Sequence, residues 1–193
     1  TYSDEKGITI NGPILFFGEI FDSYSKGNKL SDDDIKSIVE NAISMNYLPE
    51  DDNGIYFVMT SSDVDESSGF CDTYCGWHSS FKMRNSDIKY AFVGDSERCP
   101  TSCQPQAVGP NGKGGGDGMA NILVKEVLST TSDPMLNAWY DETGKESGDL
   151  CEWVFGQTYI VNNAKANMKI GSRDYLIQKN WVNQPNAGCQ FMP

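Results

Sequence analysis

Six cysteines restrict the folds open to this chain more than any other feature of its sequence. Four of them lie in two Cys-x-x-x-Cys pairs, and the full set is Cys71, Cys75, Cys99, Cys103, Cys151 and Cys189. An even set of cysteines is typical of extracellular proteins, because thiols oxidise outside the cell and stay reduced in the cytosol. We therefore predict a secreted protein whose loops are held by disulfides. The connectivity that we expect, among the many that six cysteines allow, crosses the two pairs: Cys71–Cys103, Cys75–Cys99 and Cys151–Cys189.

An alternative use of the same cysteines is a zinc site, because thiolate and imidazole are suitable zinc ligands. Its ligands would be Cys71, Cys75 and His78 with Cys99 or Cys103. The spacing Cys-x-x-x-Cys is looser than the usual Cys-x-x-Cys of zinc-binding loops, so disulfides are the preferred interpretation. His78 is the only histidine of the chain and cannot build a histidine-rich metal site alone. We predict that it is a hydrogen-bonded structural residue.

The charge of the chain excludes two classes of partner. The formal net charge is −12, whereas nucleic acids and anionic membranes recruit patches of lysine and arginine. No apolar run is long enough to span a membrane. Thr1 opens directly into polar sequence, and we expect that a signal peptide has been removed before it. The acidic surface fits a medium that contains calcium, which is the one cofactor considered; otherwise we expect none.

Residue patterns predict one α+β domain over residues 1–193, with a mixed sheet packed on two main helices. Ser31 should cap a helix that ends near Tyr47, since three aspartates follow it and apolar residues then recur at helical spacing. Residues 55–60 are expected to form a central strand and residues 88–93 an edge strand. Shorter strands are expected at residues 8–10, 158–161, 164–170 and 175–178.

The sequence PILFFGEIF, within residues 13–22, is apolar enough to be a buried strand. It must pair either with the sheet of its own chain or with that of a neighbouring molecule. In the second case the chain would self-assemble by strand addition, because an unpaired strand edge is a template for another chain.

A third apolar pattern predicts a long helix that begins at Asp117 or Gly118 and ends near Ser132, before Asp133-Pro134. The glycine-rich residues 109–118 before it would form a mobile loop, since they lack the Gly-Lys-Ser/Thr ending of a phosphate-binding loop. Most of the helix would be buried. Its polar stripe consists of Asn121, Lys125, Ser129 and Ser132, with Glu126 beside it.

This helix resembles that of secreted zincin-like proteins, whose motif is His-Glu-x-x-Glu followed by Thr-Asp-Pro. The glutamate after the first ligand is kept as Glu126, and the aspartate is kept as Asp133. The resemblance places Lys125 at the first ligand position and Ser129 at the second. A protonated lysine has no lone pair to offer to zinc. We therefore predict a zincin-like scaffold that has lost its metal site, with a salt bridge from Lys125 to a carboxylate such as Glu146 in its place.

Motifs along nearly the whole chain resemble the EXORDIUM-like, phosphate-induced-protein family. They lie at residues 18–20, 22–27, 54–64, 69–71, 74–78, 90–94, 114–119 and 167–181. The resemblance implies secretion and a role in a cell wall, matrix or cell surface. Members of the family usually carry a further N-terminal stretch, so we expect that this part is absent or processed here.

Three classes of function follow. The preferred one is a non-catalytic extracellular protein, a pseudoenzyme that binds a matrix or surface component or assembles through its N-terminal strand. The second is a metal-dependent peptidase or glycan hydrolase that would use Glu126, Asp133 and Glu146. The third is an adhesive or filament subunit stabilised by calcium. Glu146 and Asp149 are the candidate cation ligands, since hard cations bind carboxylate oxygens.

Overall fold

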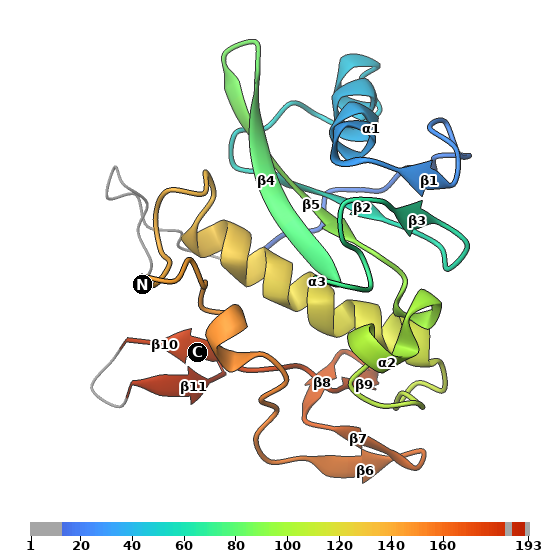
Figure 1. Ribbon diagram of the computed structural model, residues 1–193, viewed down its shortest axis with the longest axis vertical. Coiled ribbons are helices and arrows are strands. Elements are labelled where there is room, and N and C mark those ends of the chain that lie inside the picture. Colours follow the sequence, from blue (N-terminus) through green and yellow to red (C-terminus); the bar gives the residue numbers. More distant parts are fainter. Residues whose placement is uncertain (1–12, 184–186, 192–193) are drawn as a thin grey trace.

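The computed structural model describes residues 13–183 and 187–191 and has the predicted α+β class (Figure 1). The helices are α1 Asp32–Ser44, α2 Pro100–Cys103 and α3 Gly114–Ser132, with the short 3-10 helices η1 Ser96–Arg98 and η2 Asp149–Cys151. The strands are β1 Lys29–Leu30, β2 Ile55–Met59, β3 Asp65–Glu66, β4 Gly76–Met83, β5 Ser86–Val93, β6 Tyr159–Val161, β7 Ala164–Ala166, β8 Met168–Ile170, β9 Arg173–Tyr175, β10 Asn180–Val182 and β11 Gly188–Gln190. None of the helices in these residues is long and apolar enough to cross a membrane.

The largest sheet is mixed and has the strand order β2-β5-β4. Strand β5 lies in the middle, parallel to β2 and antiparallel to β4, and Ala91, Phe92 and Val93 on it are fully buried. The expectation of a central β2 and an edge β5 was therefore wrong. The reason is β4, whose polar sequence GWHSSFKM did not indicate a strand and which occupies the second side of β5.

Helix α1 covers one face of this sheet. Ser31 caps it as predicted, in a capping box with Asp34, and three aspartates occupy the first turn, where they complement the helix dipole. The buried residues Ile35, Val39 and Ile43 join a cluster that includes Tyr90 and Phe92 of β5. This cluster is the larger of two hydrophobic cores.

Helix α3 packs on the opposite face, where Met119 and Ile122 meet Val93. It ends at Ser132 as predicted but begins at Gly114. Its first turn therefore consists of residues that we expected in a mobile loop. Glycine is needed here for close approach. A Cβ at Gly118 would lie 2.3 Å from the hydroxyl oxygen of Ser96, and one at Gly115 would lie 2.6 Å from Oδ1 of Asp95.

All six cysteines are bridged, which contradicts the alternative zinc site at these residues. The bond Cys151–Cys189 was predicted correctly. The two remaining bonds are Cys71–Cys99 and Cys75–Cys103, each with a Cα–Cα distance of 5.5 Å, so the crossed pairing was wrong. The two segments lie side by side in the same direction, which pairs the first cysteine of one with the first of the other.

The predicted burial of residues 13–22 in the sheet of their own chain was wrong, whereas pairing with a neighbouring molecule stays a prediction. Residues 13–22 form no strand, and Phe16, Phe17 and Phe21 are 81%, 80% and 91% exposed. The strand expected at residues 8–10 lies outside the described residues.

Beyond α3 the chain forms hairpins. Residues 158–170 give β6, β7 and β8 close to their expected positions. Most of residues 175–178 are not a strand, since Asn167 binds this segment instead: its side-chain amide donates to the carbonyl of Ile177, and its Oδ1 accepts from the amide of Ile177. The hairpin of β10 and β11 was not predicted.

Candidate functional site

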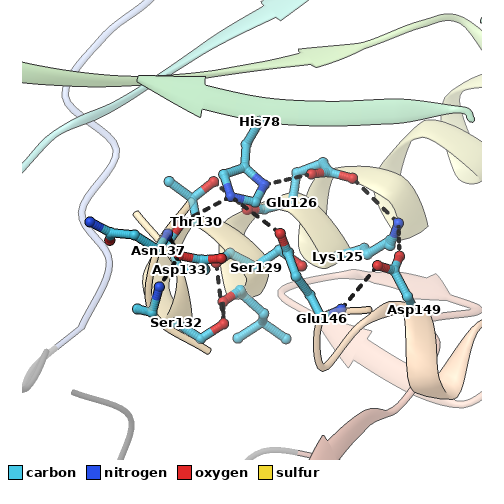
Figure 2. Close-up of polar contacts among 12 residues, drawn as sticks. His78, Lys125, Glu126, Ser129, Thr130, Ser132, Asp133, Asn137, Glu146 and Asp149 are labelled. Atoms are coloured by element: carbon cyan, nitrogen blue, oxygen red, sulfur yellow. Dashed lines mark hydrogen bonds and ion pairs between the residues drawn. The ribbon is translucent and has the colours of Figure 1, made fainter. Parts of the chain in front are cut away.

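The candidate site lies where the polar side of α3 faces β4 and the loop of residues 145–152 (Figure 2). Lys125, Glu126, Ser129 and Asp133, which the resemblance to zincin-like proteins singles out, come together here. Glu126, Ser129 and Asp133 are buried, and Lys125 is largely covered, although an amphipathic surface helix would expose its polar stripe. Charged groups in such a position must be paired, since burying an unpaired charge is very costly. The pairing therefore defines the site.

Lys125 sits between two carboxylates. Its Nζ lies 2.7 Å from Oδ1 of Asp149 and 3.7 Å from Oε1 of Glu126. The predicted salt bridge with Glu146 is thus replaced by one with Asp149, three residues further along the same loop. Burial alone would lower the pKa of Lys125, but Glu126 and Asp149 raise it above the ordinary value. The ammonium therefore stays protonated.

His78 reaches the site from β4 and was not recognised as part of it from the sequence. Its Nδ1 lies 3.4 Å from Oε2 of Glu126. Its Nε2 lies 3.1 Å from the backbone carbonyl of Asp133 and 3.7 Å from Oε1 of Glu146. Both ring nitrogens thus face acceptors, which favours the imidazolium, the form in which both carry a proton. One signal was available in the sequence: Gly76 and His78 are two residues apart, so in a strand they lie on the same face.

Several neighbours set the charge of His78. Burial alone would lower the pKa of the imidazole, but the hydrogen bond to Glu126 and the charge of Glu146 raise it. The pKa of Glu146 is raised mainly by burial, against the charge of His78 and the hydroxyl of Ser129, which both favour the carboxylate. Glu126 is thus held between His78 on one oxygen and Lys125 on the other.

Asp133 has a structural role at the end of α3. Its Oδ1 accepts hydrogen bonds from the backbone amides of Asn137 and Ala138, at 2.6 and 2.7 Å. The carboxylate thereby fixes the turn after the helix, while its own carbonyl contacts His78. Glu126, Asp133 and Glu146 therefore do not present a shared set of free oxygens.

A pocket of about 280 Å³ opens beside the ion pairs. Its lining combines the start of β4, α3 and the loop that carries Asp149: Thr73, Tyr74, Cys75, Gly76, Ile122, Lys125, Glu126, Lys145, Asp149, Glu152 and Gln178. Gly76 allows α3 to approach, since a Cβ there would lie 2.6 Å from the side chain of Ile122. The pocket offers both cations and carboxylates to a ligand.

These residues do not fit a zinc ion. Zinc needs deprotonated nitrogen, sulfur or carboxylate ligands, and this helix places an ammonium and a hydroxyl at the two ligand positions. Within residues 13–183 and 187–191, no three histidine, cysteine or carboxylate side chains are grouped so that they could hold a metal ion. Glu146 and Asp149, the candidate cation ligands, face His78 and Lys125 instead.

We expect the folded pKa of His78 to lie above its ordinary value of about 6.5. A raised pKa stabilises the fold fully below the unfolded value, and this contribution is lost as the pH rises through the folded value. Because the chain has one histidine, an NMR titration of its ring protons reports this group alone. Glu126→Gln should lower the pKa, whereas Glu40→Gln on the exposed side of α1 should not. A folded pKa at or below 6.5 would contradict the charged pairing.

Comparisons with known proteins match nearly the whole chain. The profile of a family described as the phosphate-induced protein 1 conserved region matches residues 1–184. The chain is 32% identical over 225 residues to the protein EXORDIUM-like 5 of Arabidopsis thaliana, covering 96% of this chain and 60% of that protein. It is 28% identical over 166 residues to the protein PHOSPHATE-INDUCED 1 of Nicotiana tabacum, covering 74% and 50%.

A second Arabidopsis relative, the protein EXORDIUM-like 3, is 30% identical over 220 residues, covering 93% of this chain and 63% of that protein. The chain thus spans less than two thirds of the length of these relatives. No solved structure matches the chain significantly.

Proposed function

We propose that this chain, which belongs to the phosphate-induced protein 1 family, is a non-catalytic extracellular protein that acts by binding or assembly at a wall, matrix or cell surface. Three disulfides fit an extracellular protein. The proposal further holds that α3 is the helix of a zincin-like scaffold whose metal site has been replaced by ion pairs.

One observation carries the proposal: the ammonium of Lys125 lies 2.7 Å from Asp149 and 3.7 Å from Glu126. It stands at the first ligand position of the motif and repels a dication. Glu126 would be the general base of a metallopeptidase, but it acts there on a water that the metal polarises. Here its two oxygens are held by Lys125 and His78 instead. Each oxygen thus faces a cation in place of the metal-polarised water that such a base would contact.

The pocket beside Lys125 supports binding rather than catalysis. Lys125 and Lys145 present cations, and Asp149 and Glu152 present carboxylates, within about 280 Å³. This size is at the lower end of ligand pockets, about 300 to 1,000 Å³. A ligand that fits would be a small polar group, or one residue of a larger polymer, that both accepts and donates hydrogen bonds.

The alternative of a hydrolase finds less support in the geometry. Of its three expected ligands, Asp133 is engaged with backbone amides and Glu126 with two cations. The calcium-stabilised subunit likewise relies on Glu146 and Asp149, which face His78 and Lys125. We therefore keep the non-catalytic assignment.

The proposal is tested by restoring the ligands. We expect Lys125→His with Ser129→Glu to bind zinc with a stoichiometry of one, as calorimetry would show, because Asp149 already lies against position 125 and can supply a third ligand. The same pair of changes with Asp149→Asn should bind more weakly. The unchanged chain should neither bind zinc at this helix nor cleave peptides.

Two results would overturn the proposal. One is stoichiometric zinc bound at α3 in the unchanged chain, shown by its loss in the single variant Glu126→Gln. The other is hydrolysis of a peptide or glycan that Glu126→Gln abolishes. A folded double variant that binds no zinc would reject the zincin-like origin of the helix. The non-catalytic assignment would then be decided by the assay for hydrolysis alone.

A further inference from the structure

The segment of residues 13–22 is the most apolar exposed part of the described chain. Ile14, Leu15, Phe16, Phe17 and Phe21 are between 70% and 91% exposed. Soluble proteins rarely leave a contiguous apolar patch of this kind in water unless it meets a partner. Residues 13–18 carry no charge, and the charges of the segment, Glu19 and Asp22, lie near its C-terminal end.

The backbone of the segment is also without hydrogen bonds to the part of the chain that the structure describes. No backbone group of residues 13–21 takes part in a hydrogen bond with the described residues, and Figure 1 draws the segment as coil that passes the sheet without joining it. Extended, aromatic and β-branched residues with free amides and carbonyls are what a sheet edge accepts as a further strand.

A hydrogen-bonded turn fixes the direction in which the segment leaves the domain. Asp22 accepts hydrogen bonds from the amide and the hydroxyl of Ser25, at 2.7 and 2.6 Å, and the amide of Gly27 donates to the carbonyl of Tyr24. The hydroxyl of Tyr24 donates to Asp63 at 3.0 Å, which ties the turn to the loop after β2. Tyr24 has a φ of 56°, a conformation that residues other than glycine adopt only when held.

The outer edge of β2 is an acceptor of matching character. Strand β2 pairs with β5 alone, and none of its backbone groups bonds on the other side to any described residue. Its sequence is IYFVM, and Met59 at its end is 51% exposed. An apolar edge strand without charges or a bulge is a site for strand addition.

We propose that residues 13–21 of one copy add to the outer edge of β2 in a second copy, and that the exchange is reciprocal and gives a dimer. This inference rests on the proposed function, in which the chain acts by binding or assembly, and it specifies how the assembly would form. Residues 13–21 make no backbone hydrogen bond to the β2 of their own chain, and both stretches can therefore bond to another molecule. Reciprocal exchange buries both apolar surfaces in one symmetric, closed assembly.

The charge of the chain predicts how the dimer responds to salt. Each copy carries a formal charge of −12, so two copies repel each other over distances that salt screens. We expect the dimer to dissociate at low ionic strength and to strengthen as salt is added. A dimer held by salt bridges would respond in the opposite way.

The test uses the full chain with p-benzoylphenylalanine in place of Phe17, mixed in equal parts as ¹⁵N-labelled and unlabelled protein. Irradiation should give cross-links between position 17 and residues 55–59 that join labelled to unlabelled chains, as mass spectrometry would show. Cross-links only within one chain would overturn the proposal, since the segment then covers its own β2. Cross-links to other residues, or none, would overturn it as well.

A second measurement does not depend on the cross-linker. We expect light scattering coupled to chromatography to show a dimer. The double change Phe16→Lys with Phe17→Lys should raise the concentration at which this dimer dissociates at least tenfold. Ile160→Lys removes an apolar side chain of similar exposure on β6, 67%, and should leave the dimer unchanged. A chain that stays monomeric at high concentration and high salt would reject the exchange without bearing on the metal site.

Discussion

Reduction of the three disulfides is expected to unfold the described domain near room temperature. Their cysteines are separated by 28, 28 and 38 residues, and closing a loop of this length stabilises a fold by about 3 to 4 kcal/mol. Together the three bonds approach the total stability of a typical domain, about 5 to 15 kcal/mol. Far-ultraviolet circular dichroism with and without reductant should show the loss of structure.

The individual bonds should differ in their effect. Cys103 is fully buried in the larger hydrophobic cluster, and Cys75 packs against that cluster, so replacing both by serine removes a bond and leaves two hydroxyls in apolar surroundings. We expect this pair to cost more stability than Cys151→Ser with Cys189→Ser, because Cys151, although equally buried, lies outside both hydrophobic clusters. Thiol titration of the denatured, unreduced chain is the direct check. More than trace amounts of free thiol would show that the bonds are not all formed.

The parts of the fold that the sequence predicted are those set by local rules. Helix α1 follows from the Ser31 cap, the acidic first turn and the spacing of Ile35, Val39 and Ile43. The end of α3 follows from Asp133-Pro134, because a residue before proline is disfavoured in the helical region. The strands β2 and β5 were also found from local sequence, since β2 is an apolar run and β5 is one broken only by Lys89 after its first polar residues.

The parts that were missed depend on contacts between distant segments. Strand β4 mixes polar residues with Trp77, Phe81 and Met83, and it is held by its pairing with β5, which no local pattern encodes. The same pairing brings His78 to Glu126, 48 residues away. The partner of Lys125 was placed in the correct loop but on the wrong carboxylate, because the turn of η2 decides which side chain of that loop points at α3.

Residues 13–22 show the opposite case, where a local rule indicated a strand but left open whether its sheet belongs to the same chain. An apolar run of this length predicts a buried strand, yet the described segment is exposed. The pattern indicates that the segment favours a β-sheet, but it does not distinguish a sheet of the same chain from a sheet of another molecule. That distinction requires the position of the turn at Tyr24 and the free edge of β2.

Replacement of Lys125 by methionine is expected to lower the free energy of unfolding by about 3 kcal/mol. The change keeps most of the volume of the side chain and removes the cation between Glu126 and Asp149. The side chain of Glu126 is 3% exposed and cannot regain water, whereas that of Asp149 is 35% exposed and can do so in part. Removing one partner of a buried pair costs about 3 to 5 kcal/mol, and the exposure of Asp149 favours the lower end.

Urea denaturation of Lys125→Met, compared with Lys36→Met, separates this effect from the loss of any lysine. Lys36 forms an i,i+4 pair with Glu40 at 3.6 Å, with both side chains about 40% exposed, and such pairs contribute about 0.5 kcal/mol or less. Asp149→Asn in the Lys125→Met background should recover part of the loss, because it removes one of the two charges left without a partner. If Lys125→Met is as mild as Lys36→Met, the ion pairs around Glu126 do not hold the site together, and the replacement of a metal by Lys125 loses its physical basis.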